Sequence, residues 1–164
     1  MTTALLQGFP PVVDDTAEVL ILGSFPSVLS LASGQYYGNP RNAFWPITGE
    51  LFGFDPAAPY ESRLAALQSA RVALWDVLKR CRRTGSADAK IEPNSVEAND
   101  FGHLFDDHPS ITRVCFNGSA AQKLYARLVD TDASVEYLLL PSSSPARAMP
   151  AGRKLDAWRI IASS

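Results

Sequence analysis

The sequence has few of the residues that build metal centres or disulfide frameworks. Only two of its 164 residues are cysteines and two are histidines. Cys81 and Cys115 lie far apart, and neither stands near a histidine at a metal-ligand spacing. We therefore expect no metal site, no disulfide and no other cofactor. Cys115 falls within an apolar run, which predicts a small core residue.

The sequence also lacks long apolar runs and an excess of positive charge. No run approaches the roughly 20 residues that a membrane-spanning helix needs, and no basic segment followed by an apolar stretch begins the chain. We therefore expect a cytoplasmic protein without a signal peptide or membrane partner. The formal net charge of −2 argues mildly against nonspecific binding to nucleic acid. Basic residues do gather locally, at 79–83 and 147–154.

Apolar residues make up 46% of the chain, and their pattern predicts the fold class. Nearly continuous apolar segments predict buried parallel strands at residues 18–25, 71–78, 113–116 and 135–140. Helical periodicity predicts helices at residues 44–52, 59–70, 119–129 and 154–162. The alternation predicts an α/β fold, a three-layer α/β/α sandwich with a central four-stranded parallel sheet. We expect one domain over residues 1–164, a monomer, and a long, functional surface loop at residues 82–99.

Small polar residues follow three of the four predicted strands. They are Gly23-Ser24-Phe25-Pro26-Ser27, Asn117-Gly118-Ser119 and Pro141-Ser142-Ser143-Ser144-Pro145. Ligands of open parallel sheets bind at this end of the strands, and serine hydroxyls with free backbone N–H groups can hold phosphate oxygens. Ordinary strand-to-helix turns have a similar composition, so that interpretation stays open. Residues 36–45 combine two tyrosines, two asparagines and an arginine with Phe44 and Trp45, a mixture that suits a flat, polar ring.

These motifs resemble the uracil-DNA glycosylase superfamily, and within it the hypoxanthine (deoxyinosine) DNA glycosylase branch. The resemblance covers almost the whole chain, in the family's order, and rests on residues 22–27, 34–46, 74–78, 85–88, 99–101, 116–118 and 140–146. It implies a monofunctional enzyme of base excision repair that flips a deaminated base out of DNA and hydrolyses its N-glycosidic bond. Hypoxanthine is the favoured base, and uracil is possible. No lysine lies in a pocket motif to form a Schiff base.

Two departures from the superfamily pattern bear on activity. Many members place a carboxylate or Asn two residues after the first glycine to position the water, whereas this chain has Phe25 there. Leu140 stands where the superfamily often has a histidine, which argues against a highly active uracil enzyme. Phe25 favours an alternative function, a catalytically inactive nucleic-acid or nucleotide-binding domain on the same fold. A serine hydrolase is disfavoured because neither His103 nor His108 lies in a strand-end motif.

The resemblance also implies roles for individual residues. Asn42 is the candidate catalytic residue, although an asparagine there can also cap the following helix. Asn39 and Asp76 are possible supporting residues, Asn39 being also a simple turn former. The base would contact Ser24, Phe25, Tyr37, Phe44 and Asn117. Two alternatives stay open: Phe25 can pack beneath the pocket, and Phe44 can be the first residue of a core helix. The phosphates would be bound by Ser27, Ser142, Ser143, Ser144 and Arg147.

Overall fold

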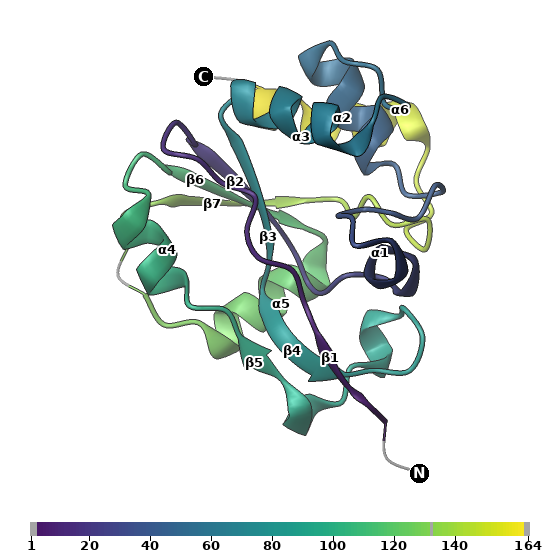
Figure 1. Cartoon of the computed structure of the whole chain (residues 1–164), viewed down its shortest axis with the longest axis vertical. Coiled ribbons are helices and arrows are strands. Elements are labelled where there is room, and N and C mark those ends of the chain that lie inside the picture. The colour runs from purple at the N-terminus through teal and green to yellow at the C-terminus, as the bar shows by residue number, and fades with distance from the viewer. Residues whose placement is uncertain (1–2, 132, 163–164) are drawn as a thin grey trace.

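A parallel four-stranded sheet forms the centre of the structure, a computed structural model that describes residues 3–131 and 133–162 (Figure 1). Its strands run in the order β3-β2-β6-β7, with bounds β2 (Val19–Gly23), β3 (Val72–Asp76), β6 (Arg113–Asn117) and β7 (Glu136–Leu140). The four predicted parallel strands are therefore confirmed, but the predicted burial is wrong for β7, which lies at the edge of the sheet and buries only Leu140. The register pairs Gly23 with Asp76 and Asn117 with Leu140, so the carboxyl ends of the strands share one edge.

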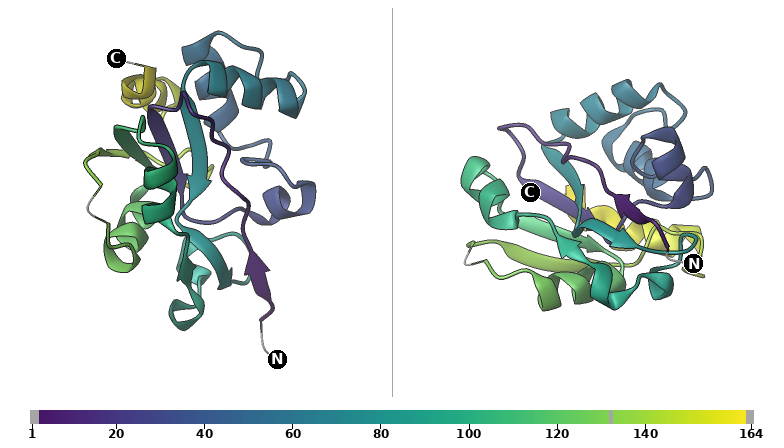
Figure 2. Two further views of the ribbon diagram at one scale, coloured as in Figure 1. Left: turned by 60° about the vertical axis from the view of Figure 1, so that its left-hand side comes forward. Right: turned by 60° about the horizontal axis from the view of Figure 1, so that its bottom comes forward.

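Helices cover both faces of this sheet (Figure 2). One face carries α2 (Phe44–Phe52), α3 (Tyr60–Ser69), α6 (Ala151–Trp158) and the 3-10 helix η3 (Arg159–Ala162); the other carries α4 (Phe101–Asp107) and α5 (Ser119–Leu128). Alternate residues of β2 enter two separate cores, because successive side chains of a strand point to opposite faces. Leu20 packs in the cluster that contains Phe101, and Ile21 in the cluster that contains Trp158. The predicted three-layer sandwich is confirmed.

A second, antiparallel sheet was not predicted. It has the order β1-β4-β5, with bounds β1 (Leu5–Gln7), β4 (Leu78–Arg82) and β5 (Glu97–Ala98). The expected strand at residues 71–78 in fact divides after Asp76: the Val77 N–H donates to the Gly23 carbonyl (2.8 Å), and Leu78 begins β4. A strand of two or three residues is too short for its alternation to be recognised in a sequence.

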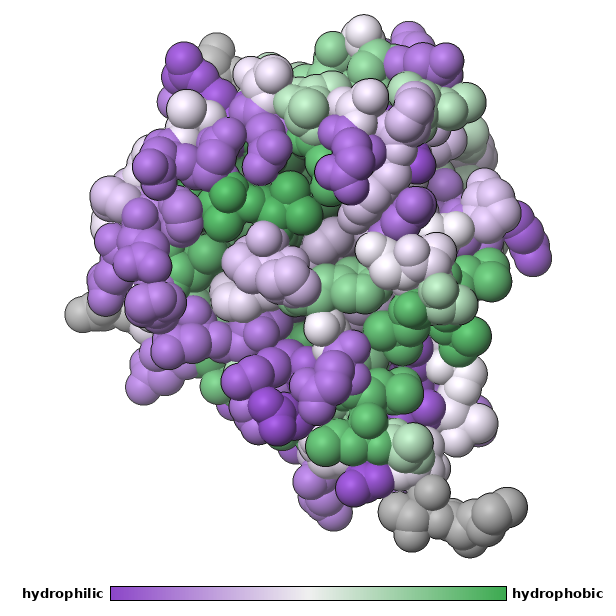
Figure 3. Space-filling model, in the orientation of Figure 1, coloured by the Kyte–Doolittle hydropathy of each residue, from purple (hydrophilic) through white to green (hydrophobic). Residues whose placement is uncertain are grey.

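The predicted surface loop at residues 82–99 is more ordered than its composition suggests. It contains β5 and the 3-10 helices η1 (Asp88–Lys90) and η2 (Pro93–Ser95). A short helix, α1 (Val28–Ser33), also follows the turn after β2, capped by Ser27 and ended by Gly34 at φ 68°. Apolar surface lies over α1 (Figure 3), where Val28 and Leu29 are half exposed. Over the described residues, no helix has both the length and the apolar character required to cross a membrane.

Candidate active site

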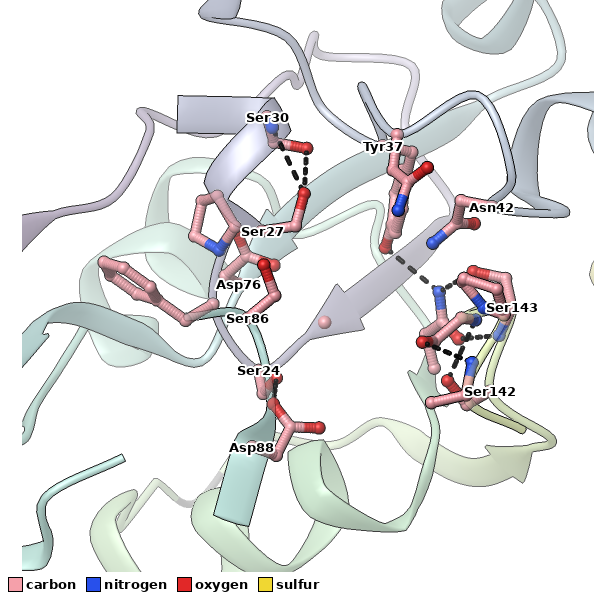
Figure 4. A pocket seen from close by; sticks show the side chains of 18 of the residues that line it. Ser24, Ser27, Ser30, Tyr37, Asn42, Asp76, Ser86, Asp88, Ser142 and Ser143 are labelled. Atoms are coloured by element: carbon pink, nitrogen blue, oxygen red, sulfur yellow. Dashed lines mark hydrogen bonds between the residues drawn. The ribbon is translucent and has the colours of Figure 1, made fainter. Parts of the chain in front are cut away.

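A cavity of about 400 Å³ lies at the carboxyl edge of the parallel sheet (Figure 4). Four loops contribute most of its lining: the turn after β2, the loop before α2, the loop that follows β4, and the serine turn after β7. Gly23 lies between Asp76 of β3 and Asn117 of β6, and all three line the cavity. The cavity therefore occupies the edge at which open α/β sheets bind their ligands, as the sequence predicts.

Gly23 keeps the centre of this edge open. A Cβ atom at this position would lie 2.6 Å from Oδ1 of Asp76 and 3.4 Å from the hydroxyl oxygen of Tyr37. Any side chain here would collide with the Asp76 carboxyl group. The absent side chain thus allows Asp76 and Tyr37 to approach the end of β2 together.

Tyr37 and Asn117 form one wall through a hydrogen-bonded network. The Asn117 side-chain amide donates to the Tyr37 hydroxyl (3.2 Å) and to Oγ of Ser143 (2.9 Å), and Oδ1 of Asn117 accepts from the Ser143 N–H (2.8 Å). Burial, together with the nearby Asp76, raises the pKa of Tyr37 above its usual range. The Tyr37 hydroxyl therefore keeps its proton at neutral pH and can donate it to an acceptor in the cavity.

Phe44 lies behind this wall and not in it. Its ring is fully buried and stacks on the Tyr37 ring, with centroids 3.9 Å apart and an angle of 19° between the planes. It is absent from the cavity lining. The structure therefore gives Phe44 a supporting place beneath Tyr37, at the start of a core helix, and does not support the alternative of direct contact with the base. The Tyr37 backbone has a φ of 55°, uncommon for a bulky residue.

Asn42 combines a capping contact with a free donor. Its Oδ1 accepts the Phe44 N–H (2.9 Å) at the start of α2, so the capping role foreseen in the sequence is present. Its amide nitrogen makes no hydrogen bond with any described residue, and the side chain lines the cavity near Tyr37 and Ser143 (Figure 4). The neighbouring Ala43 N–H donates to the Ser143 carbonyl (2.9 Å), which fixes the Asn42 segment to the serine turn.

Asn39 lines the same cavity but also has a clear local role. Its Oδ1 accepts the Arg41 N–H (3.0 Å) and its carbonyl accepts the Asn42 N–H (2.9 Å). This is the turn-forming behaviour that the sequence suggested. Asn39 therefore supports Asn42 by shaping the loop that carries it.

The turn after β2 is held by the loop that follows β4. The Ser24 hydroxyl donates to Oδ1 of Asp88 (2.6 Å), and the Val28 N–H donates to Oγ of Ser86 (2.9 Å). Ser27 caps α1 by accepting the Ser30 N–H (3.1 Å). Ser30, Ser86 and Asp88 all line the cavity, and the sequence did not single them out as site residues.

Phe25 also lines the cavity, but its side chain belongs to the core. It is 7% exposed and packs in the same cluster as Leu22 and Leu78. The Arg83 guanidinium lies 5.3 Å from the centre of its ring and donates to the Pro26 carbonyl (2.7 Å). Phe25 is thus covered by a cation, which leaves its ring little surface for stacking on a base.

The three serines after β7 have different environments. Ser143 is 1% exposed, and its hydroxyl oxygen accepts a hydrogen bond from the Asn117 amide. It therefore stabilises the turn, and its hydroxyl is not accessible to a phosphate. Ser142 and Ser144 are partly exposed and line the cavity. Arg147 is exposed and, with Ser142, lines a neighbouring hollow of about 390 Å³. The buried Lys154 ammonium donates to the Arg147 carbonyl (3.3 Å) and so supports this loop.

Asp76 is the most perturbed acid in the cavity. It is 5% exposed, and burial raises its pKa from 3.8 to about 7; the charge of Asp88 adds to this rise and the Arg83 guanidinium opposes it. Perturbed acids in a cleft are common at functional sites. Among the described residues, no group of three or more His, Cys, Asp or Glu side chains is placed to hold a metal ion.

The sequence is similar to those of known proteins. Residues 10–162 match the model of the uracil-DNA glycosylase superfamily. A protein named hypoxanthine DNA glycosylase from Methanosarcina acetivorans is 40% identical over 156 residues, 94% of this chain and 96% of the relative. A protein of the same name from Methanosarcina barkeri is 40% identical over 149 residues, 90% of this chain and 92% of the relative.

A solved structure shares the fold. It is the solution NMR structure of a candidate uracil-DNA glycosylase from Methanosarcina acetivorans, with a TM-score of 0.77 and 37% identity. The match covers 96% of this chain and 99% of that one. The structural similarity therefore extends over nearly the whole chain.

Proposed function

The chain belongs to the uracil-DNA glycosylase superfamily, and we propose that it is a monofunctional DNA glycosylase of base excision repair that removes hypoxanthine from DNA. The cavity supports this proposal because its volume of about 400 Å³ is enough for a flipped base. Its walls offer an aromatic hydroxyl at Tyr37 and amide groups at Asn42 and Asn117. The relatives named hypoxanthine DNA glycosylase support hypoxanthine as the base.

The free amide of Asn42 is the observation that carries the proposed chemistry. Hydrolysis breaks the bond between the base nitrogen and C1′ of the sugar, while a water oxygen forms the new bond to C1′. In our proposal the second lone pair of Asn42 Oδ1 orients this water, and its unpaired N–H group donates to the base carbonyl. Phe25 has no polar side-chain group and cannot perform either task. In this proposal Asn42 therefore takes the place of the carboxylate or Asn that many superfamily members carry two residues after the first glycine.

The remaining site residues would hold the flipped nucleotide. Tyr37 and Asn117 form one wall of the base pocket, and Ser24 lies on the opposite side, where its hydroxyl donates to Asp88. We propose that Ser27, Ser142, Ser144 and Arg147 bind the flanking phosphates, with Ser143 holding the serine turn in place. The half-exposed Val28 and Leu29 on α1 would then lie against the apolar parts of the DNA next to the flipped nucleotide.

The test is base release from labelled duplexes that carry hypoxanthine, uracil or xanthine, followed by alkali cleavage of the abasic site. The wild type should release hypoxanthine, and Asn42→Ala should lose this activity by on the order of 100-fold or more while it still binds DNA. Asn42→Asp keeps the oxygen that accepts the Phe44 N–H but lacks the amide donor. It should retain the helix cap and still be slow.

Asn94→Ala is the matched control, because Asn94 is exposed and lies outside the cavity. Release of uracil alone would keep the superfamily chemistry and overturn hypoxanthine as the base. DNA binding without release of any base would favour an inactive binding domain, the function that Phe25 suggests. Equal activity of Asn42→Ala and wild type would remove Asn42 from the reaction.

We further propose that the chain acts as one glycosylase domain and as a monomer, and that its DNA substrate is met in the cytoplasm. The apolar faces of its helices and strands are largely used in the two core clusters, which supports the monomer. Analytical ultracentrifugation with and without a hypoxanthine duplex tests it: a stable dimer in both conditions would overturn this part of the proposal.

A further inference from the structure

The side chain of Asp76 has no hydrogen-bond partner among the described residues. Its Oδ2 is fully buried and unpaired, and no hydrogen bond reaches Oδ1 either. Buried polar groups in proteins are nearly always hydrogen-bonded. Oδ2 is closed to a ligand, whereas Oδ1 lies on the Gly23 side of the carboxyl group, at the cavity lining. Oδ1 is therefore the oxygen suited to meet a partner on the ligand.

The groups around Asp76 favour its neutral form. The loop after β4 contributes Asp88, whose charge disfavours a second anion, and Arg83, whose attraction opposes that effect. Arg83 does not pair with Asp76 directly: its guanidinium donates to the carbonyls of Gly85 (2.6 Å) and Pro26 (2.7 Å). The loop before α2 contributes Tyr36 and Tyr37, both neutral because burial raises the pKa of each.

The position of Asp76 places this acid next to the base-binding wall. Gly23 and Asp76 are paired in register at the ends of β2 and β3, and Oδ1 of Asp76 and the Tyr37 hydroxyl both lie close to the position that a side chain at Gly23 would occupy. The other carboxyl group of the cavity, Asp88, is exposed and accepts the Ser24 hydroxyl. Asp76 is thus the cavity carboxyl that is withdrawn from water.

We propose that the protonated carboxyl group of Asp76 is the acid that protonates the departing base. This rests on the proposed glycosylase function. As the bond between C1′ and the base nitrogen breaks, its electron pair stays with the base, and the Asp76 proton passes to a ring nitrogen of the purine. The water oxygen bonds to C1′ and releases one proton to solvent. Solvent then returns a proton to the Asp76 carboxylate, so the enzyme ends the cycle unchanged.

No histidine lines the described cavity, so the departing base has no imidazole donor there. A carboxylic acid kept neutral by burial can take this role, since general acids work best when their pKa lies near the working pH. A pKa of about 7 meets this condition.

The experiment measures single-turnover release of hypoxanthine by wild type, D76N and the control D106N across about pH 5.5 to 9. Asp106 is exposed on α4 and lies outside the cavity. The wild-type and D106N rates should be constant below about pH 7 and fall above it, where Asp76 loses its proton. The D76N rate at about pH 6 should be lower by on the order of 100-fold, with the fall above pH 7 absent.

A second substrate separates proton donation from a structural role. A duplex carrying 7-methylhypoxanthine, compared at the acid end of the pH range where N1 keeps its proton, presents a base that is already cationic and needs no further proton to leave. D76N should release it at close to the wild-type rate, measured above spontaneous depurination. Equal losses on both substrates, or a D76N profile identical to wild type on hypoxanthine, would overturn the proposal. Failure of the glycosylase function itself looks different, because the wild type would then release no base at any pH.

Discussion

Replacing Asp76 by Asn should stabilise the protein at neutral and alkaline pH. The folded state holds the Asp76 proton up to about pH 7, whereas the unfolded chain releases it near the ordinary value of 3.8. Between these values the folded state binds more protons than the unfolded state, so the free energy of unfolding falls as pH rises. Asn has the same shape without the charge, so the variant is free of this penalty.

The size of the effect follows from the same two values. A difference of about three pH units, at 1.36 kcal/mol for each unit, corresponds to about 4 kcal/mol when Asp76 is fully ionised. Relaxation of the site and entry of water at high pH will reduce it. D76N should thus be more stable than wild type by up to about 4 kcal/mol at pH 8, and the difference should nearly vanish near pH 4.

Urea unfolding followed by the fluorescence of the three tryptophans measures this directly at a series of pH values. D106N, which removes an exposed carboxylate, should differ from wild type by less than about 0.5 kcal/mol at every pH. A D76N protein that is less stable than wild type at pH 8 would refute the reasoning. A stabilisation that is the same at pH 4 and pH 8 would also refute it, because the effect would then not come from the proton.

Two further variants examine the cavity and its rim. Gly23→Ala puts a methyl group 2.6 Å from Oδ1 of Asp76. It should therefore reduce the rate of single-turnover base release by on the order of 100-fold, with little change in DNA affinity. An unchanged rate would show that this edge of the cavity does not hold the base. Arg147→Ala removes an exposed cation beside Ser142, so it should weaken binding of damaged and undamaged duplex alike and lower the slope of log K against log salt by about 1. A slope equal to that of wild type would mean that Arg147 contacts no phosphate.

The central sheet could be predicted because each of its strands contains a short run of consecutive apolar residues. A strand such as β2 is buried on both faces, and this leaves a local signature that needs no knowledge of its neighbours. β4 leaves no such signature, because its sequence Leu-Lys-Arg-Cys-Arg places only Leu78 and Cys81 in the core. Its strand character depends on pairing with β1, about 75 residues away along the chain, which the local pattern does not encode.

The site could be predicted only where local sequence determines it. Asn42 and the serine turn were found from short motifs, and both line the cavity. Ser86 and Asp88 were missed as site residues because their contacts with Val28 and Ser24 span 58 and 64 residues. The sequence leaves Phe44 open between the cavity wall and the core, because an aromatic residue at the start of a helix suits both. Its place behind Tyr37 is a tertiary contact between the two rings, which a sequence does not reveal.

Two features that lower the stability of the fold, one at Tyr37 and one at Asp76, occur next to the end of β2. Tyr37 has a backbone conformation that costs a residue other than glycine on the order of 1–3 kcal/mol, and Asp76 buries a carboxyl group without hydrogen bonds. Both lie against Gly23, and strain of this kind is found where function requires a fixed geometry. Substitutions at this site should therefore differ from substitutions in the core. Substitution of a core residue lowers stability and activity together, whereas D76N should raise the free energy of unfolding while it slows release of the base.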